Sequence, residues 1–154
     1  NRLNISSIEA VTMDARDALY HFEKESFDRI LVDAPCSGLG VIQRKPDIKW
    51  TKSIEDIYRL AKVQREILEA VWPLLKVNGL LVYSTCTVDK EENEQLITKF
   101  VEDHHDAAFD RTLKKRVPEA FQALASDFGW LQLFPGMIGT DGFFISAVKK
   151  DAKK

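Results

Sequence analysis

Apolar positions along the chain fall into short, mainly apolar runs separated by stretches with a helical period. The runs Phe27–Val32 and Leu80–Ser84 read as strands that are covered on both faces. Between them, apolar residues recur at three- and four-residue steps, which predicts a helix from about Ser53 to Leu75. Strands that alternate with helices indicate an α/β fold in which the strands pair in parallel through right-handed crossovers.

The same pattern predicts elements at both ends of the chain. Ser53 or Thr51 could cap the central helix, while Asn78 and Gly79 suit its exit. Residues 106–117 are irregular and basic. The further predicted elements are a strand at Ile8–Met13, a helix over Ala15–Phe22, a helix capped by Asp89 and ending near Glu102, a short helix from Pro118 to Phe128, and two closing strands, Leu131–Phe134 and Phe143–Val148, which form an antiparallel edge pair.

Composition indicates an ordinary globular domain. The chain has 154 residues, of which 45% are hydrophobic and 30% charged, and its formal net charge is −2. We therefore expect a single cytoplasmic domain without a membrane segment or secretory leader. A negative balance gives no bulk attraction to nucleic acid, so any such contact must come from local basic stretches. They are Arg44, Lys45, Lys49 and Lys52; Arg111, Lys114, Lys115 and Arg116; and the four lysines of the C-terminal tail.

Reactive side chains follow the predicted strands. Asp14 follows the first strand, Asp33 and Cys36 the second, and Cys86 the third. Neighbouring strands lie about 4.8 Å apart, so both cysteines and Asp33 should meet in one cleft if the second and third strands are neighbours. A nucleophilic thiol needs help from a helix N-terminus or a positive neighbour, and the helix expected after Cys86 could supply it.

Simpler interpretations exist for each of these residues. A cysteine at a strand end is more often a small buried filler, Asp33 alone would more often cap a turn, and Asp14 could cap the next helix. Trp50 could stack on a base, although we favour a packed position in the core. The two cysteines are too few for a disulfide scaffold, and their spacing does not suggest a metal site.

Two motifs together are more specific. Asp33-Ala34-Pro35-Cys36-Ser37-Gly38, followed by Gly40 and by Arg44 to Trp50, resembles motif IV of the RNA cytosine-5 methyltransferases. Ser84-Thr85-Cys86-Thr87, followed by Glu91-Glu92-Asn93, resembles their motif VI, and Asp141-Gly142-Phe143-Phe144 resembles their C-terminal strand. The resemblance extends from Ile8 to about Lys150.

The resemblance implies a mechanism and a set of roles. Cys86 would be the nucleophile that adds to carbon 6 of cytosine, and Cys36 would assist breakdown of the covalent product. Asp33 would stabilise the pyrimidine and, with Asp14 and Pro35, would contact S-adenosylmethionine. The implied substrate is small-subunit ribosomal RNA, whose target base must be unstacked, and Arg44, Lys45 and Lys49 are placed to hold its phosphates.

The sequence also departs from this family. No glycine-rich cofactor turn and no ribose-binding acidic residue precede Ile8. We therefore expect residues 1–154 to be the C-terminal portion of a catalytic domain. The expected fold is a partial Rossmann-like class I methyltransferase fold, with a mostly parallel sheet whose first two strands are missing. By itself this portion should be inactive and should bind S-adenosylmethionine weakly.

Three alternatives remain open at this stage. The chain could be a non-catalytic RNA-binding or scaffold module with the same fold. It could be a thiol-redox domain that uses Cys36 and Cys86 as a reversible pair, although it lacks the Cys-x-x-Cys spacing. A DNA cytosine methyltransferase is less favoured, because that family takes its nucleophile from motif IV.

Overall fold

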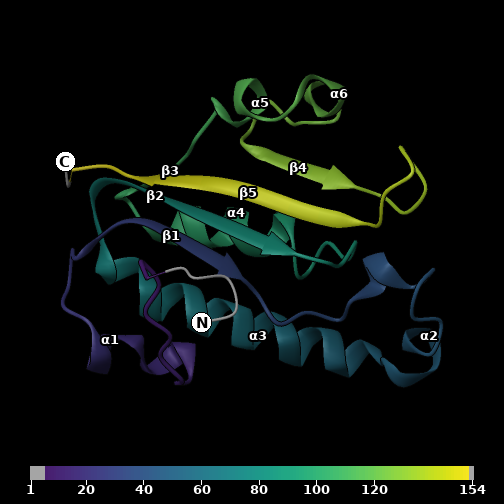
Figure 1. Cartoon of the computed structure of the whole chain (residues 1–154), viewed down its shortest axis with the longest axis horizontal. Coiled ribbons are helices and arrows are strands. Elements are labelled where there is room, and N and C mark those ends of the chain that lie inside the picture. Colours follow the sequence, from purple (N-terminus) through teal and green to yellow (C-terminus); the bar gives the residue numbers. More distant parts are fainter. Residues whose placement is uncertain (1–5, 153–154) are drawn as a thin grey trace.

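The structure is a computed structural model that describes residues 6–152, and it contains one five-stranded sheet with helices packed on it (Figure 1). The strands are β1 (Phe27–Asp33), β2 (Leu75–Thr85), β3 (Ala107–Phe109), β4 (Trp130–Leu133) and β5 (Phe143–Lys150). The helices are α1 (Ala18–His21), α2 (Ile48–Thr51), α3 (Ile54–Val71), α4 (Glu94–Asp103), α5 (Leu113–Arg116) and α6 (Glu119–Gln122). Short 3₁₀ turns cover Ala15–Asp17, Leu39–Val41 and Trp72–Leu74.

The sheet topology confirms the predicted α/β class. β1 and β2 pair in parallel, and β5 runs antiparallel to β2, to β3 and to β4. Four of the five described strands therefore point the same way, and β5 alone runs against them. β3 and β4 bond to successive parts of the same edge of β5, so the predicted antiparallel pair at the C-terminal edge is present.

The core lies between the sheet and the helices α3 and α4. Leu81 and Tyr83 of β2 face these helices and are fully buried with Leu68 and Phe100. α3 and α4 also contact each other, because the Arg65 guanidinium pairs with a carboxylate oxygen of Asp103 at 3.0 Å. Burying such side chains contributes about 1.5–3 kcal/mol each, which makes this layer the main source of stability.

The start of α3 follows the sequence prediction. The Ser53 side chain accepts a hydrogen bond from the Asp56 backbone N–H, and the Asp56 side chain accepts one from the Ser53 N–H. The end of α3 differs from the prediction. The helix stops at Val71, and Leu75, the predicted last residue of the helix, is the first residue of β2. Asn78 (φ 63°) and Gly79 lie inside β2, where the pairing register with β1 shifts. They form an irregularity within a strand and not a helix exit.

The strand predicted at Ile8–Met13 is wrong. These residues form no regular element, and Ile8 is 70% exposed. A strand needs a partner for its backbone groups, and none of the described strands pairs with this segment. The helix predicted over Ala15–Phe22 is present as a 3₁₀ turn followed by α1, both packed on α3 (Figure 1).

The C-terminal third contains more short elements than predicted. β3 and α5 form within the segment expected to be irregular, and α6 is one turn where a helix to Phe128 was expected. α4 begins at Glu94, five positions after the predicted cap Asp89. The Asp89 carboxylate accepts a hydrogen bond from the Glu91 N–H instead, which closes a local turn ahead of the helix.

Candidate active site

The two cysteines meet beyond the ends of β1 and β2. These strands are neighbours, with Asp33 in register with Ser84, so the residues that follow both strands emerge side by side. The sulfur atoms of Cys36 and Cys86 lie 3.3 Å apart, and both thiols are free and half-buried. The predicted convergence is therefore confirmed, although fifty positions separate the two cysteines in sequence.

Asp33 lies at the same end of β1 and β2 as the two cysteines. Its carboxylate accepts a hydrogen bond from the Ser84 hydroxyl at 3.0 Å, and the residue, which is the last of β1, is exposed. Pro35, between Asp33 and Cys36, is also exposed. A carboxylate and two sulfur atoms are therefore found at or just after the carboxyl ends of two neighbouring parallel strands.

The three loops that carry Gly40, Cys86 and Gly142 pack closely against one another beside the cysteines. The Gly40 N–H donates to the Cys86 carbonyl at 3.0 Å, and the Gly142 N–H donates to the Gly40 carbonyl at 2.8 Å. A Cβ at Gly40 would meet the Gly142 carbonyl and would lie 2.7 Å from the Cys86 carbonyl oxygen. Only a glycine lets these backbones approach so closely, which gives a physical role to Gly40 and Gly142 of the recognised motifs.

A buried polar network underlies the site, and sequence reasoning missed it. Glu92 is fully buried and accepts hydrogen bonds from the Ser37 N–H and from the Gln64 side chain, at 2.9 and 2.8 Å. The Ser37 hydroxyl also donates to Glu92, and Tyr83 donates to the Gln64 amide oxygen. Glu92 stands in motif VI, but we interpreted that segment as the first turn of a helix. Gln64, a polar residue within the helical stripe, gave no signal.

Burial raises the pKa of the Cys36 thiol to about 12, from an ordinary value of 9.0, and the adjacent Cys86 sulfur adds to the rise. Folding therefore favours the protonated thiol. In the unfolded chain the same group ionises near pH 9, so this contribution to stability is complete below pH 9 and is lost as the pH rises towards 12.

This shift predicts slow alkylation of Cys36. At pH 8, iodoacetamide should modify Cys36 in the folded protein at least about tenfold more slowly than in the urea-unfolded chain, because the thiolate is the reacting form. The rate should keep rising as the pH is increased beyond 9. Peptide mass spectrometry after timed quenching measures this rate, and equal rates in the folded and unfolded chains would contradict the assignment.

Asp14 is not brought to the cysteines by any contact among the described residues. Its side chain accepts a hydrogen bond from the Arg16 N–H and caps the first 3₁₀ turn, as the simpler interpretation had it. Both carboxylate oxygens also bond to the Arg16 guanidinium, and these bonds lower the pKa of Asp14 to about 2. In the S-adenosylmethionine contact implied for Asp14, the cofactor would share this carboxylate with Arg16.

The residues present therefore fit only part of an S-adenosylmethionine site. Asp33 and Pro35 are exposed beside the thiols, but Asp14 is already paired with Arg16. The glycines that follow β1, Gly38 and Gly40, are both buried, and Gly40 is packed against the backbones of Cys86 and Gly142.

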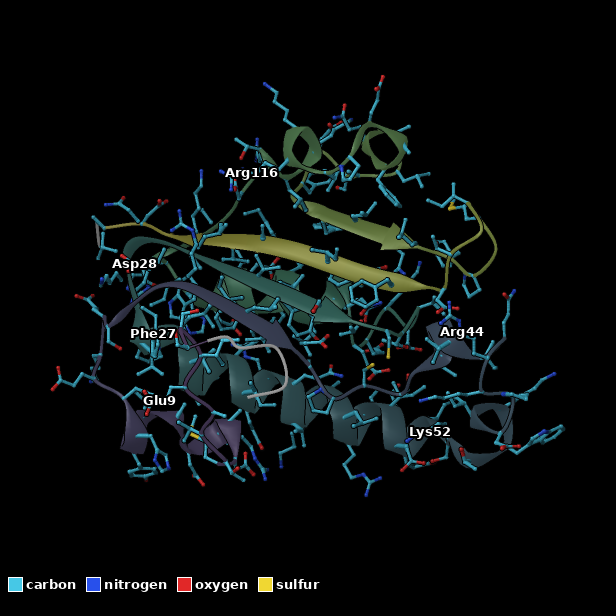
Figure 2. All side chains as sticks on the ribbon, in the orientation of Figure 1. Glu9, Phe27, Asp28, Arg44, Lys52 and Arg116 are labelled. Atoms are coloured by element: carbon cyan, nitrogen blue, oxygen red, sulfur yellow. The ribbon has the colours of Figure 1, made fainter. Side chains whose placement is uncertain are left out.

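The first basic stretch lies at the same end of the molecule as the site. Figure 2 shows Arg44 and Lys52 beyond the ends of the strands, whereas Arg116 lies across the sheet. Arg44 pairs with the Asp141 carboxylate at 3.0 Å and stays largely exposed.

The core position favoured for Trp50 is wrong, since this side chain is 84% exposed, with the Lys49 ammonium 5.9 Å from its ring centre. α2 is a single turn that projects from the fold, so it has no core to enter.

The described residues contain neither a membrane-spanning helix nor a candidate metal site. No helix in residues 6–152 combines the length and apolarity that a membrane crossing requires. Nor do these residues gather histidine, cysteine and carboxylate side chains into a candidate metal site.

The fold and the paired motifs define a Rossmann-like methyltransferase, and comparison with known proteins assigns the family. The family model described as 16S rRNA methyltransferase RsmB/F matches residues 1–149, and the chain belongs to this family. It is 53% identical over 150 residues to the "Probable ribosomal RNA small subunit methyltransferase B" of Bacillus subtilis, covering 97% of this chain and 33% of that protein. It is 44% identical over 139 residues to the ribosomal RNA small subunit methyltransferase B of Photorhabdus laumondii, covering 90% of this chain and 30% of that protein. The chain thus spans about a third of the length of these relatives.

Solved structures agree with this assignment. The crystal structure of the protein PH0851 superposes with a TM-score of 0.86 at 30% identity, covering 97% of this chain and 32% of that one. NSun6 from Pyrococcus horikoshii, solved with SFG, gives a TM-score of 0.77 at 28% identity, covering 99% of this chain and 37% of that one.

Proposed function

We propose that this chain is the C-terminal part of the catalytic domain of an S-adenosylmethionine-dependent enzyme that methylates carbon 5 of a cytosine in small-subunit ribosomal RNA. The observation that carries the proposal is the pair of thiols 3.3 Å apart beside Asp33, at the carboxyl ends of two parallel strands. The names of the relatives support the ribosomal substrate, and SFG, an analogue of S-adenosylmethionine, in a structural neighbour supports the methyl donor.

The proposed chemistry begins at Cys86. Its thiolate adds to carbon 6 of the flipped cytosine, which makes carbon 5 an enamine carbon with enough electron density to attack. S-adenosylmethionine, held against Asp33 and Pro35, would supply the methyl group to carbon 5 and would leave as the neutral thioether. Asp33 would stabilise the ring protonated at nitrogen 3 during the attack by Cys86. A base then takes the proton from carbon 5, and the Cys86 sulfur leaves carbon 6, which restores the aromatic ring.

Cys36 would act in this last step. Its sulfur lies within contact distance of the Cys86 sulfur, and its raised pKa keeps it protonated at neutral pH. A protonated thiol beside the departing sulfur can donate a hydrogen bond to the developing thiolate, which favours elimination. Arg44, Lys45 and Lys49 would hold the phosphates that flank the target nucleotide.

The test of this function uses the full-length protein. We expect it to transfer the labelled methyl group of S-adenosylmethionine to small-subunit ribosomal RNA, and nucleoside mass spectrometry should identify the product as 5-methylcytidine. Methylation at another ring position would overturn the chemistry proposed here. RNA binding without any methyl transfer would favour the non-catalytic RNA-binding module.

The affinity of the isolated chain for S-adenosylmethionine tests the proposed cofactor site. Isothermal titration of S-adenosylmethionine into the 154-residue chain should give a Kd of about 1 mM or weaker, because the residues present form one wall of the site and leave Asp14 paired with Arg16. The full-length protein, titrated in parallel, should bind far more tightly. Micromolar binding by the isolated chain would contradict this prediction.

A further inference from the structure

The residue after each cysteine carries a hydroxyl group, and the two hydroxyls bond to each other. Ser37 follows Cys36, Thr87 follows Cys86, and their oxygen atoms lie 2.8 Å apart. Both side chains are buried, with 2% and 0% of their surface exposed. They reach neither solvent nor a bound RNA, so any effect on the reaction must act through the cysteines beside them.

Neighbouring groups fix the direction of this hydrogen bond. The single hydroxyl proton of Ser37 is donated to the Glu92 carboxylate, so the Ser37 oxygen accepts from Thr87. The Thr87 oxygen in turn lies 3.3 Å from the Asp89 N–H, which donates to it. The bonds therefore run in one direction, from Asp89 through Thr87 and Ser37 to Glu92.

Glu92 also holds the other side of the Cys36 loop through Gln64. The Gln64 side-chain nitrogen donates to the Pro35 carbonyl and to Glu92, at 2.8 Å each. The Ser37 N–H donates to Glu92 at 2.9 Å. The residues before and after Cys36 are thus both tied to one buried carboxylate.

The loop that carries Cys86 has separate support. The Asn93 side chain accepts a hydrogen bond from the Thr85 hydroxyl at 2.6 Å and donates to the Thr87 carbonyl at 3.1 Å. Removing the Ser37–Thr87 contact would therefore leave the Cys86 loop with its own support, and it would take away one of the bonds that hold the Cys36 loop against it. The hydroxyl pair is the side-chain bond that joins the residue after Cys36 directly to the residue after Cys86.

We propose that Ser37, Thr87 and Glu92 are positioning residues that set the separation of the two thiols, and that the reaction needs this separation for release of the covalently bound RNA. The inference rests on the proposed function, in which Cys86 acts in both halves of the reaction and Cys36 only in the second. Catalytic steps are sensitive to displacements of about 1 Å, so a shift of Cys36 should slow release and spare the first methyl transfer.

The experiment uses the full-length protein with the substitutions Ser37→Ala, Thr87→Val and Glu92→Gln. Single-turnover assays measure methyl transfer, and denaturing gels follow the decay of the covalent RNA adduct. We expect adduct decay to slow by about tenfold or more while the first methyl transfer changes by no more than about twofold.

Thr87→Ser keeps the hydroxyl and should restore release. Ser146→Ala, which removes a buried hydroxyl bonded to the Gly129 carbonyl, is the matched control and should leave both rates unchanged.

A second readout does not depend on activity. Incubation in glutathione redox buffers converts the two thiols to a disulfide, with two glutathione thiols formed from one glutathione disulfide, and mass spectrometry after alkylation gives the equilibrium constant. Ser37→Ala and Thr87→Val should lower this constant by about tenfold, because one of the bonds that hold the sulfur atoms close together is lost. If the wild-type protein methylates nothing, the proposed function fails, yet this constant still decides whether the hydroxyls position the thiols. An unchanged constant, or methyl transfer and release slowed equally, would overturn the inference.

Discussion

Replacing Cys86 with alanine in the full-length protein should lower methyl transfer by about four orders of magnitude or more, because the ring carbon then has no nucleophile to activate it. Cys36 cannot take over, since it belongs to the other loop and its raised pKa keeps it protonated. RNA that contains 5-fluorocytidine should form a stable covalent adduct with the wild-type protein and none with Cys86→Ala. Denaturing electrophoresis of labelled RNA measures the adduct directly.

Cys36→Ala is the informative companion to this variant. It should still attack the base and transfer the methyl group, but it should accumulate a persistent adduct even with ordinary cytidine, since release is impaired. Circular dichroism of both variants should match the wild type, because the two thiols are half-buried and neither fills the core. A covalent adduct on Cys86→Ala would reverse the roles of the two cysteines.

Gly40→Ala should destroy the site by a different route. The new methyl group would meet the Gly142 carbonyl and would come within 2.7 Å of the Cys86 carbonyl, and both obstacles are backbone atoms that a side-chain rotation cannot move. Overpacking of this kind costs about 1–3 kcal/mol, and the loop that carries Cys86 must shift to relieve it. We expect a lower free energy of unfolding in urea and a loss of methyl transfer of about 100-fold or more.

The control for this substitution is Gly139→Asn. Gly139 has φ +73°, and a Cβ placed there would meet no atom within 4 Å. Asparagine tolerates this left-handed conformation better than most residues, so the change should cost little stability and leave the loop crossing intact. Wild-type stability and activity in Gly40→Ala would show that the three loops are not packed as described.

The sequence predicted the parts of the fold that follow from periodicity. β1, α3 and β5 are long or strongly patterned, and each is found close to its predicted position. The strand at Ile8–Met13 failed because a strand depends on a partner, which local pattern does not report. The sequence prediction also missed the early start of β2, for a related reason. Asn78 and Gly79 can be recognised as an irregularity within a strand only when the pairing with β1 is known.

The sequence predicted the part of the site whose reactive residues stand at the ends of neighbouring strands. Two cysteines and Asp33, at the ends of neighbouring parallel strands, could be expected to lie together. The two sulfur atoms meet at 3.3 Å, and Asp33 bonds to Ser84, two residues before Cys86. Glu92 and Gln64 could not be found in this way, because a buried carboxylate and a helical glutamine look like surface residues in sequence. Only the fold shows that their partners, Ser37 and Pro35, come from a loop far away along the chain.

The sheet has one edge whose exposure affects how the isolated chain should behave. β1 bonds only to β2 among the described strands, and Leu31, which lies on the face away from α3, is 69% exposed. Such an edge offers free backbone donors and acceptors beside apolar surface, and these conditions favour pairing with a strand of another molecule. Preparations of the 154-residue chain should therefore self-associate as concentration rises, and a charged substitution at Leu31 should shift them towards monomer in sedimentation experiments.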